Sequence, residues 1–230
     1  MTAQRHFHEE LDRLQSRLVG MAGLAEEMVR MAVEALHARD AERAAEVIER
    51  DSEVDALEVE IDDLAIQLLA LQQPMARDLR FITMAMKISN DLERVGDHAV
   101  NIAEEVEHLL HSPAVPALPE IEEMVRISTD MLSDALDAFI RLDTRLARSL
   151  GRRDDRVDEL HANVFRILLT HMMEDPRKIS AGMDLFLVSR NLERIADLAT
   201  NIAEDVVFLV EGRNIRHRPE ARAPEPSPAD

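Results

Sequence analysis

DLERVGDHAVNIAEE, over residues 91–105, is repeated one hundred residues later as NLERIADLATNIAED, over residues 191–205. Nine of the 15 aligned positions are identical, and acidic and amide residues are among them as well as apolar ones. A requirement for packing alone would preserve the apolar positions of a helix. The repeat therefore indicates a chemical constraint on these positions in addition to a hydrophobic one.

Both copies divide into two faces when they are placed on an α-helix with about 100° between successive residues. One face is apolar and is expected to pack, with Gly96 and Ala196 at its edge, where a small residue lets a neighbouring helix come close. The other face is a stripe of acidic and amide residues. Its members are Glu93, Asp97, Asn101 and Glu104 in the first copy and Glu193, Asp197, Asn201 and Glu204 in the second.

Carboxylates four residues apart on a helix repel each other by roughly 0.2–0.5 kcal/mol, yet the arrangement occurs in both copies. A bound cation would offset this repulsion, and oxygen ligands suit magnesium, calcium and manganese, or iron and zinc in carboxylate-rich sites. Asp55 and Asp158 occupy equivalent positions on the preceding helices and are candidate further ligands. The alternative is a solvated acidic face that Arg residues from a neighbouring helix bridge.

The composition excludes several classes of protein. The net charge of −19 over 230 residues argues against nucleic acid as the main partner and against adsorption to anionic lipid. No secretory signal is visible at the start, and no apolar run approaches the roughly 18 residues that would span a bilayer. Cysteine is absent, which fits a reducing compartment. A soluble, cytoplasmic protein without direct membrane insertion is expected.

Helix-forming residues are abundant, and the prolines fall in a few places that divide the chain into helical segments. A break in the second segment near residues 51–52, where Asp51 or Ser52 could cap a helix, is considered, and Gly212 is expected to end the last segment. The expected helices run over about residues 7–36, 40–72, 77–111, 120–150, 154–174 and 183–211.

The repeat extends beyond the opening motif, since Asp40, Asp51 and Asp55 match Asp143, Asp154 and Asp158 at an offset of 103. The sequence therefore predicts an all-α fold, a tandem repeat of two antiparallel three-helix bundles. The expected boundaries are residues 1–112 for the first bundle, 113–119 for a proline-rich linker, 120–212 for the second bundle and 213–230 for a disordered tail.

Other chemical motifs are weaker. Glu105-x-x-His108 has the spacing of a ferritin-like di-iron ligand pair, but Phe208 stands where the second copy would need its histidine. His98 is interpreted as a packing or surface residue. Most methionines, such as Met21, Met28, Met124 and Met131, are interpreted as core residues, and a methionine-rich partner groove is the alternative. No glycine-rich phosphate loop and no convincing Ser/His/Asp arrangement is present, so no catalytic residue is assigned and the chain is not expected to be an enzyme.

The two Glu-x-x-x-Asp motifs, at residues 93–97 and 193–197, resemble those of the PhoU family of phosphate-uptake regulators. The QPMARDLR segment at residues 73–80 resembles the family as well. The resemblance implies a cytoplasmic, often homodimeric protein that represses phosphate uptake and the phosphate-starvation regulon. It implies two partners, the ATPase of the phosphate ABC transporter and a sensor histidine kinase, and metal at the acidic motifs in some members.

Three hypotheses follow. The first is a regulatory adaptor with metal-loaded acidic sites, in which the ion is iron, zinc, manganese or magnesium. The second is a carboxylate-bridged metalloenzyme, a hydrolase or an oxidase, which would need a vacant coordination position and a substrate pocket. The third is a metal-free helical scaffold whose acidic stripes bind basic partner helices.

Overall fold

The structure is a computed structural model that describes residues 2–72, 74–113 and 115–215. The expected disordered tail lies, from residue 216 onward, outside the described residues. Six long helices account for most of the fold, together with a short helix, α5 (Thr144–Ser149), and a 3₁₀ turn, η1 (Pro176–Lys178). The long helices are α1 (Thr2–Ala38), α2 (Ala41–Gln72), α3 (Ala76–Leu110), α4 (Pro119–Arg141), α6 (Gly151–Glu174) and α7 (Ile179–Glu211).

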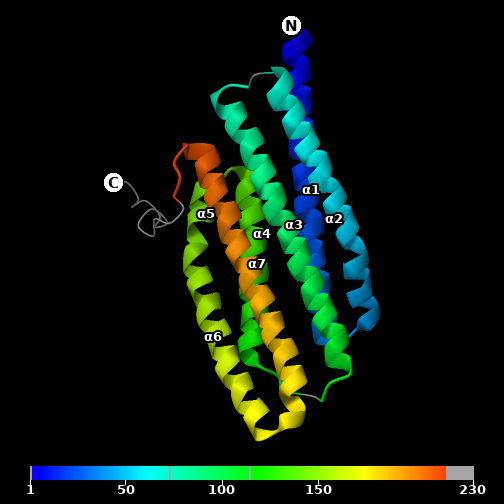
Figure 1. Ribbon diagram of the computed structural model, residues 1–230. Helices are drawn as coiled ribbons and strands as arrows, with labels where there is room; N and C mark the ends of the chain where they lie inside the picture. The colour runs from blue at the N-terminus through cyan, green and yellow to red at the C-terminus, as the bar shows by residue number, and fades with distance from the viewer. Residues whose placement is uncertain (1, 73, 114, 216–230) are drawn as a thin grey trace, which may run out of the picture.

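The helices form two antiparallel three-helix bundles, which confirms the predicted fold class. Figure 1 shows α1, α2 and α3 on one side and α4, α6 and α7 on the other, with α3 and α7 side by side between them. The α2–α3 connection lies at one end of the molecule and the equivalent α6–α7 connection at the opposite end. The second bundle is therefore inverted relative to the first.

Two polar contacts fix the direction of α3 against α7. Lys87 Nζ lies 3.3 Å from Asp205 Oδ1, and His98 Nδ1 lies 2.9 Å from Asn191 Oδ1. His98 lies further along α3 than Lys87, whereas its partner Asn191 lies earlier on α7 than Asp205. The two helices therefore run antiparallel. The two copies of the repeated motif consequently face each other across the middle of the molecule.

The α1–α2 and α4–α5 turns have the same design. Arg39 and Leu142 adopt left-handed backbone conformations, with φ of 52° and 53°. The aspartate that follows each of them caps the next helix: Asp40 accepts from two backbone N–H groups of α2, and Asp143 from two of α5. The expected helix over residues 120–150 was wrong, because the chain turns at this cap.

The considered break near residues 51–52 was also wrong, since α2 is continuous from Ala41 to Gln72. Ser52 does not act as a cap. Its Oγ donates instead to the backbone oxygen of Glu49 at 3.1 Å, one turn back, which a helix tolerates. The carboxyl group of Asp51 faces α3, as described below.

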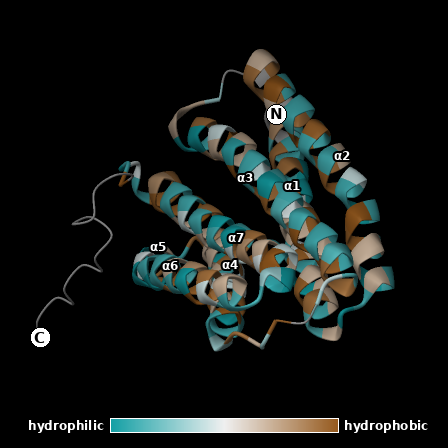
Figure 2. Cartoon of the chain, turned by 60° about the horizontal axis from the view of Figure 1, so that its bottom comes forward, coloured by the Kyte–Doolittle hydropathy of each residue, from teal (hydrophilic) through white to brown (hydrophobic). Residues whose placement is uncertain are grey.

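A single aliphatic core runs through both bundles. The apolar residues of α3 and α7 that the motif predicted to pack, including Leu92, Ile102, Leu192 and Ile202, are fully buried. The expected core methionines are also confirmed, since Met21, Met28, Met124 and Met131 have no exposed surface. Figure 2 shows hydrophilic and hydrophobic residues on different sides of the helices. None of the helices in the described part of the chain is long and apolar enough to cross a membrane.

Gly96 lies where α2 crosses α3, as the pattern predicted. A Cβ atom at this position would meet Val54 Cγ1 at 3.5 Å, an ordinary van der Waals distance. Ala196 already carries a methyl group at the equivalent buried position of α7. The packing therefore admits alanine at position 96.

We expect Gly96→Ala to raise the free energy of unfolding by about 0.5–1 kcal/mol, because glycine costs that much relative to alanine inside a helix. Urea denaturation measures the change. Gly20→Ala is the matched control, since a Cβ at Gly20 meets no atom within 4 Å and reports helix propensity alone. A loss of stability for Gly96→Ala, with a gain for Gly20→Ala, would show that the α2–α3 contact is tighter than described.

Candidate metal centre

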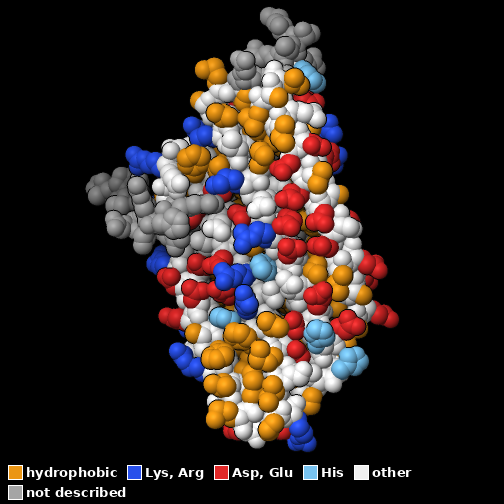
Figure 3. Space-filling model, viewed as in Figure 1, with side chains coloured by type: hydrophobic (Ala, Val, Ile, Leu, Met, Phe, Trp, Pro, Cys, Tyr) orange, Lys and Arg blue, Asp and Glu red, His pale blue; other side chains and the backbone are white. Residues whose placement is uncertain are grey.

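The first acidic cluster is built by two antiparallel helices. Asp51, Asp55 and Glu58 follow one another at helical spacing along one face of α2, opposite Glu93 and Asp97 of α3. The charges of the other four carboxylates all act on Glu93, which identifies the five as one group. Figure 3 shows the corresponding band of acidic side chains over α2 and α3.

The electrostatics of this first cluster are unfavourable without a cation. Burial raises the pKa of Glu93 from 4.5 to about 7, with further contributions from Asp97, Glu58, Asp55 and Asp51. Burial likewise raises the pKa of Asp51, helped by the charges of Asp55 and Asp97. Among the ion pairs of the described residues, none joins Lys or Arg to these five carboxylates.

The nearest polar side chains do little to neutralise the first cluster. Arg94 turns away along its own helix, and its Nη1 lies 3.5 Å from Asp91 Oδ1. Asn90 Nδ2 donates to Glu58 Oε1 at 3.4 Å, a long hydrogen bond. The cluster therefore consists of carboxylate oxygens in excess of hydrogen-bond donors.

The second cluster has the same plan but a different charge balance. Asp158 on α6 lies near Glu193 and Asp197 on α7. Burial raises the pKa of both Asp158 and Glu193, and the negative charge of Asp197 raises it further. Arg194 bridges the two motif carboxylates, with Nη1 2.9 Å from Asp197 Oδ2 and Nε 3.3 Å from Glu193 Oε2. The motif sequence Glu-Arg-x-x-Asp is shared, yet the arginine neutralises only the second copy.

A histidine replaces a carboxylate in the second cluster. His161 stands at the position equivalent to Glu58, and its charge acts on Asp158. Its Nδ1 lies 2.9 Å from Ser189 Oγ, and its ring stacks on Phe186 with centroids 5.1 Å apart. These contacts hold the ring against α7, so its orientation is set by packing.

The remaining members of the predicted stripe lie in different surroundings. Glu104 is exposed and lies seven residues, about 10 Å, along α3 from Asp97. Its counterpart Glu204 is buried, with 6% of its surface exposed. Asn101 is half-buried, and Asn201 lines a cleft of about 260 Å³. Within this cleft Asn201 lies with Arg94, Asp154, Arg194, Asp197, Leu198 and Thr200.

Sequence reasoning missed two carboxylates of the first cluster, Asp51 and Glu58. Asp51 was considered as a helix cap, although its match with Asp154 was visible in the repeat. The signal that identifies both residues is their spacing from Asp55, four residues before it and three after it. That spacing places all three on the same face of a helix.

The donor sets differ in how well they fit a cation. Five clustered carboxylates without a basic partner suit a hard or borderline divalent ion, and the raised pKa values of Asp51 and Glu93 express the same need for positive charge. In the second cluster, Arg194 already supplies that charge, so an ion would have to displace it. Of the two motif clusters, the first is the better candidate metal centre. Among the described residues, the group whose three ligand atoms lie within 4.8 Å of one another is a different one, Glu105, His108 and Asp184.

The comparison with known proteins matches both halves of the chain. The model of the PhoU domain family matches residues 18–106 and again residues 121–206. The chain is 42% identical to the "phosphate-specific transport system accessory protein PhoU homolog" of Zymomonas mobilis, over 92% of this chain and 90% of the relative. It is 37% identical to the PhoU accessory protein of Serratia marcescens, over 92% and 87%.

Solved structures agree with this similarity. The crystal structure of PhoU from Pseudomonas aeruginosa superimposes with a TM-score of 0.87 at 40% sequence identity, covering 90% of this chain and all of the other. The phosphate transport system regulatory protein PhoU of Streptococcus pneumoniae gives a TM-score of 0.83 at 31% identity, covering 90% and 98%.

The raised pKa of Glu93 predicts a specific pH dependence in metal-free buffer. The folded state holds this proton more tightly than the unfolded state, so the free energy of unfolding falls as the pH rises from 4.5 to about 7. We expect Glu93→Gln to remove this slope and to be more stable than wild type above pH 7. The expected gain is about 1 kcal/mol, since partial exposure to water screens the repulsion.

Chemical denaturation at several pH values, in the presence of a chelator, measures this effect. Glu107→Gln, an exposed change on the same helix, is the control and should keep the wild-type slope. An unchanged slope in Glu93→Gln would contradict the assigned electrostatics.

Proposed function

The chain belongs to the PhoU family, and from this premise we propose that it is a negative regulator of phosphate uptake and of the phosphate-starvation regulon. The observation that carries the proposal is the match of both bundles, including both acidic motifs, to proteins named as phosphate-specific transport accessory proteins. We propose that it acts in the cytoplasm as a homodimeric adaptor. Its partners are the ATPase subunit of the phosphate ABC transporter and a sensor histidine kinase.

Two exposed apolar patches support a bridging role. Figure 3 shows apolar side chains at opposite ends of one face, over the α2–α3 end and over the α6–α7 end. Because the second bundle is inverted, equivalent hairpins lie at opposite ends of the molecule and provide separate contact surfaces. The α2–α3 patch comprises Ile66, Leu71, Met75 and Leu79, and the α6–α7 patch comprises Phe165, Leu169, Met173, Ile179 and Met183.

Metal at the first cluster is part of the proposal. Glu93 and Asp97 would supply ligands from α3, and Asp51, Asp55 and Glu58 from α2. An ion there would hold the two helices together and remove the repulsion among five carboxylates. Iron, zinc, manganese and magnesium all accept such oxygen ligands, and the ion bound follows supply as well as affinity. The second cluster would take an ion only when Arg194 moves aside.

A regulatory role is favoured over catalysis by where the cavities lie. Two grooves of about 500 and 590 Å³ are lined by α1 with other elements, and neither is lined by a motif carboxylate. The smaller cleft beside Asp197 is lined by two arginines, Arg94 and Arg194. A hydrolase or oxidase built on these carboxylates would need a substrate pocket next to its metal.

We expect Glu93→Gln/Asp97→Asn to lose more bound metal than the matched pair Glu193→Gln/Asp197→Asn, because only the first cluster lacks a neutralising arginine. Elemental analysis of protein purified without chelators measures the metal content per chain. Equal losses in both pairs would contradict the role given to Arg194. Unchanged metal content in the first pair would remove the first cluster as the metal site, and wild-type protein that carries no metal would support the metal-free scaffold instead.

The regulatory role predicts that deleting the gene makes phosphate-starvation genes active in phosphate-replete cells. The wild-type gene should restore repression, whereas Leu169→Asp/Met173→Asp should not, because charge on the α6–α7 patch blocks apolar contact with a partner. A reporter of a phosphate-starvation promoter measures the outcome, with circular dichroism to confirm folding.

Ile140→Asp is the matched control, since Ile140 is exposed on α4 outside both patches. It should restore repression. Normal repression in the deletion strain would refute the regulatory role, and repression by the patch variant would remove that patch from it.

A further inference from the structure

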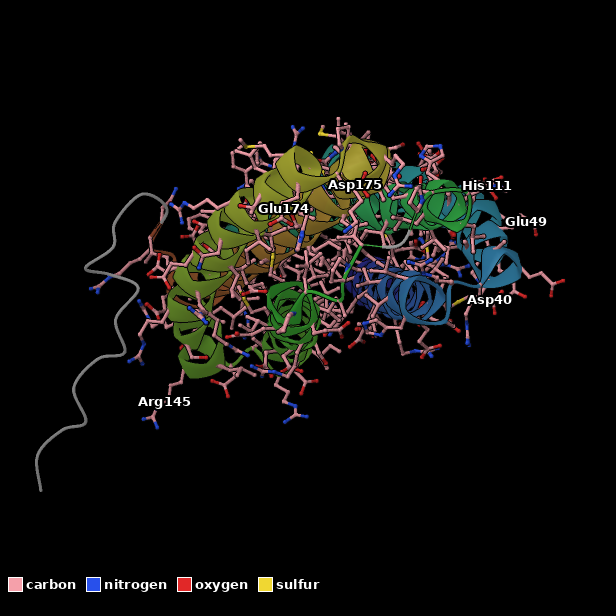
Figure 4. The ribbon with its side chains drawn as sticks, turned by 90° about the horizontal axis from the view of Figure 1, so that it is seen from below. Asp40, Glu49, His111, Arg145, Glu174 and Asp175 are labelled. Carbon is pink, nitrogen blue, oxygen red and sulfur yellow. The ribbon has the colours of Figure 1, made fainter. Side chains whose placement is uncertain are left out.

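A third group of potential ligands lies at one end of the α3–α7 contact. Glu105 and His108 belong to the last two turns of α3, and Asp184 to the second turn of α7. One ligand atom from each lies within 4.8 Å of the others. Figure 4 shows the molecule from this end, with His111 at the end of α3 and Asp175 at the α6–α7 turn labelled. Glu105 is eight residues, about 12 Å, along α3 from Asp97, so this group is separate from the motif clusters.

Asp184 is buried without a hydrogen-bond donor for one of its oxygens. Only 8% of its surface is exposed, and its Oδ2 has no hydrogen-bond partner. The Glu105 side chain beside it is 13% exposed. A buried, unpaired carboxylate oxygen is costly, and a second carboxylate in the same place increases that cost. Burial raises the pKa of both groups, against the opposing effects of His108 on each and of a hydrogen bond between Glu105 and Asp184.

At the opposite end of the α3–α7 contact, a buried carboxylate is neutralised by a lysine. Asp205 occupies the position equivalent to Glu105, and it is 2% exposed. Lys87 reaches it from α3 at 3.3 Å and supplies a positive charge. The position equivalent to Lys87 on α7 is Leu187, so no lysine reaches Glu105 from there.

The other two members of the group also differ between the copies. Met84 occupies the position equivalent to Asp184, and Phe208 occupies the position equivalent to His108. One end of the contact therefore has a carboxylate with a lysine and two apolar residues. The other end has two carboxylates and a histidine, with no Lys or Arg ion pair to Glu105 or Asp184 among the described residues.

We propose that Glu105, His108 and Asp184 bind one divalent transition-metal cation, which takes the place that Lys87 fills at the opposite end. A mixed set of one imidazole and two carboxylates suits zinc, manganese or iron(II) rather than calcium. The cation lies at the carboxyl end of α3, where the helix dipole favours positive charge. His108 is 66% exposed, so water reaches the ion and completes its coordination.

This site crosses between the bundles, which the motif clusters do not. Glu105 and His108 come from the first bundle and Asp184 from the second, so binding fixes the end of α3 to the start of α7. The bound ion thereby stabilises one arrangement of the two bundles. The free protein keeps a cluster of negative charge at that seam, which opposes the same arrangement.

Zinc titration with a chromophoric competitor tests the proposal. The parent protein carries Glu93→Gln, Asp97→Asn, Glu193→Gln and Asp197→Asn, which remove the four motif carboxylates, and it is checked for helicity. We expect it to bind about one equivalent of Zn²⁺ that is lost in Asp184→Asn and in His108→Ala. The matched control, Glu107→Gln/His111→Ala, changes an exposed glutamate and histidine at the same helix end and should keep the equivalent.

Two further readouts make the result independent of folding in the parent. In the wild-type background, Zn²⁺ should raise the melting temperature, and Asp184→Asn should reduce that shift while being no less stable than wild type without metal. With Co²⁺, one paramagnetically shifted imidazole signal should disappear in His108→Ala. Equal zinc stoichiometry in the parent and in Asp184→Asn would overturn the proposal, as would a folded parent that binds no zinc.

Discussion

The antiparallel contact between α3 and α7 is the constraint on which the rest of the structure depends. Both helices carry the repeated motif, and both use its apolar face for packing, where Leu92, Val95, Leu192 and Ile195 are fully buried. With that face occupied, Glu93 and Glu193 turn toward the second helix of their own bundle. The acidic clusters thus form within each bundle, between α2 and α3 and between α6 and α7. The contact also places equivalent hairpins at opposite ends of the molecule, which suits a protein that meets two partners.

Duplication gave two chemically similar halves, and their present differences lie in how carboxylates are neutralised. Arg194 bridges Glu193 and Asp197, whereas its counterpart Arg94 pairs with Asp91 and leaves the first cluster without a cation. Lys87 neutralises Asp205 at one end of the α3–α7 contact, and no equivalent lysine exists at the other. Because a partly or fully buried carboxylate among like charges is destabilising unless it is paired, protonated or bound to an ion, metal is expected at the two groups that lack a Lys or Arg partner.

Much of the fold follows from the sequence, because proline spacing and the repeat carry its main information. Five of the six expected helices, the tandem bundles and the burial of Met21, Met28, Met124 and Met131 were predicted correctly. The turn before Asp143 could have been predicted as well, since Asp40 is its equivalent in the repeat. Other features depend on tertiary contacts that periodicity does not contain. Arg94 and Arg194 occupy the same position of the motif, but Arg94 pairs with Asp91 and Arg194 pairs with Glu193 and Asp197. Asp184 meets Glu105 only because α3 and α7 run antiparallel.

An anomalous difference map from crystals grown with Mn²⁺ tests the central claim most directly, namely that unneutralised carboxylates determine where this fold binds metal. Peaks are predicted between α2 and α3 at Glu93 and Asp97, and between α3 and α7 at Glu105, His108 and Asp184. The ion pair of Arg194 with Glu193 and Asp197 should persist. A peak at Glu193 and Asp197 alone, or no peak at either predicted position, would contradict the claim.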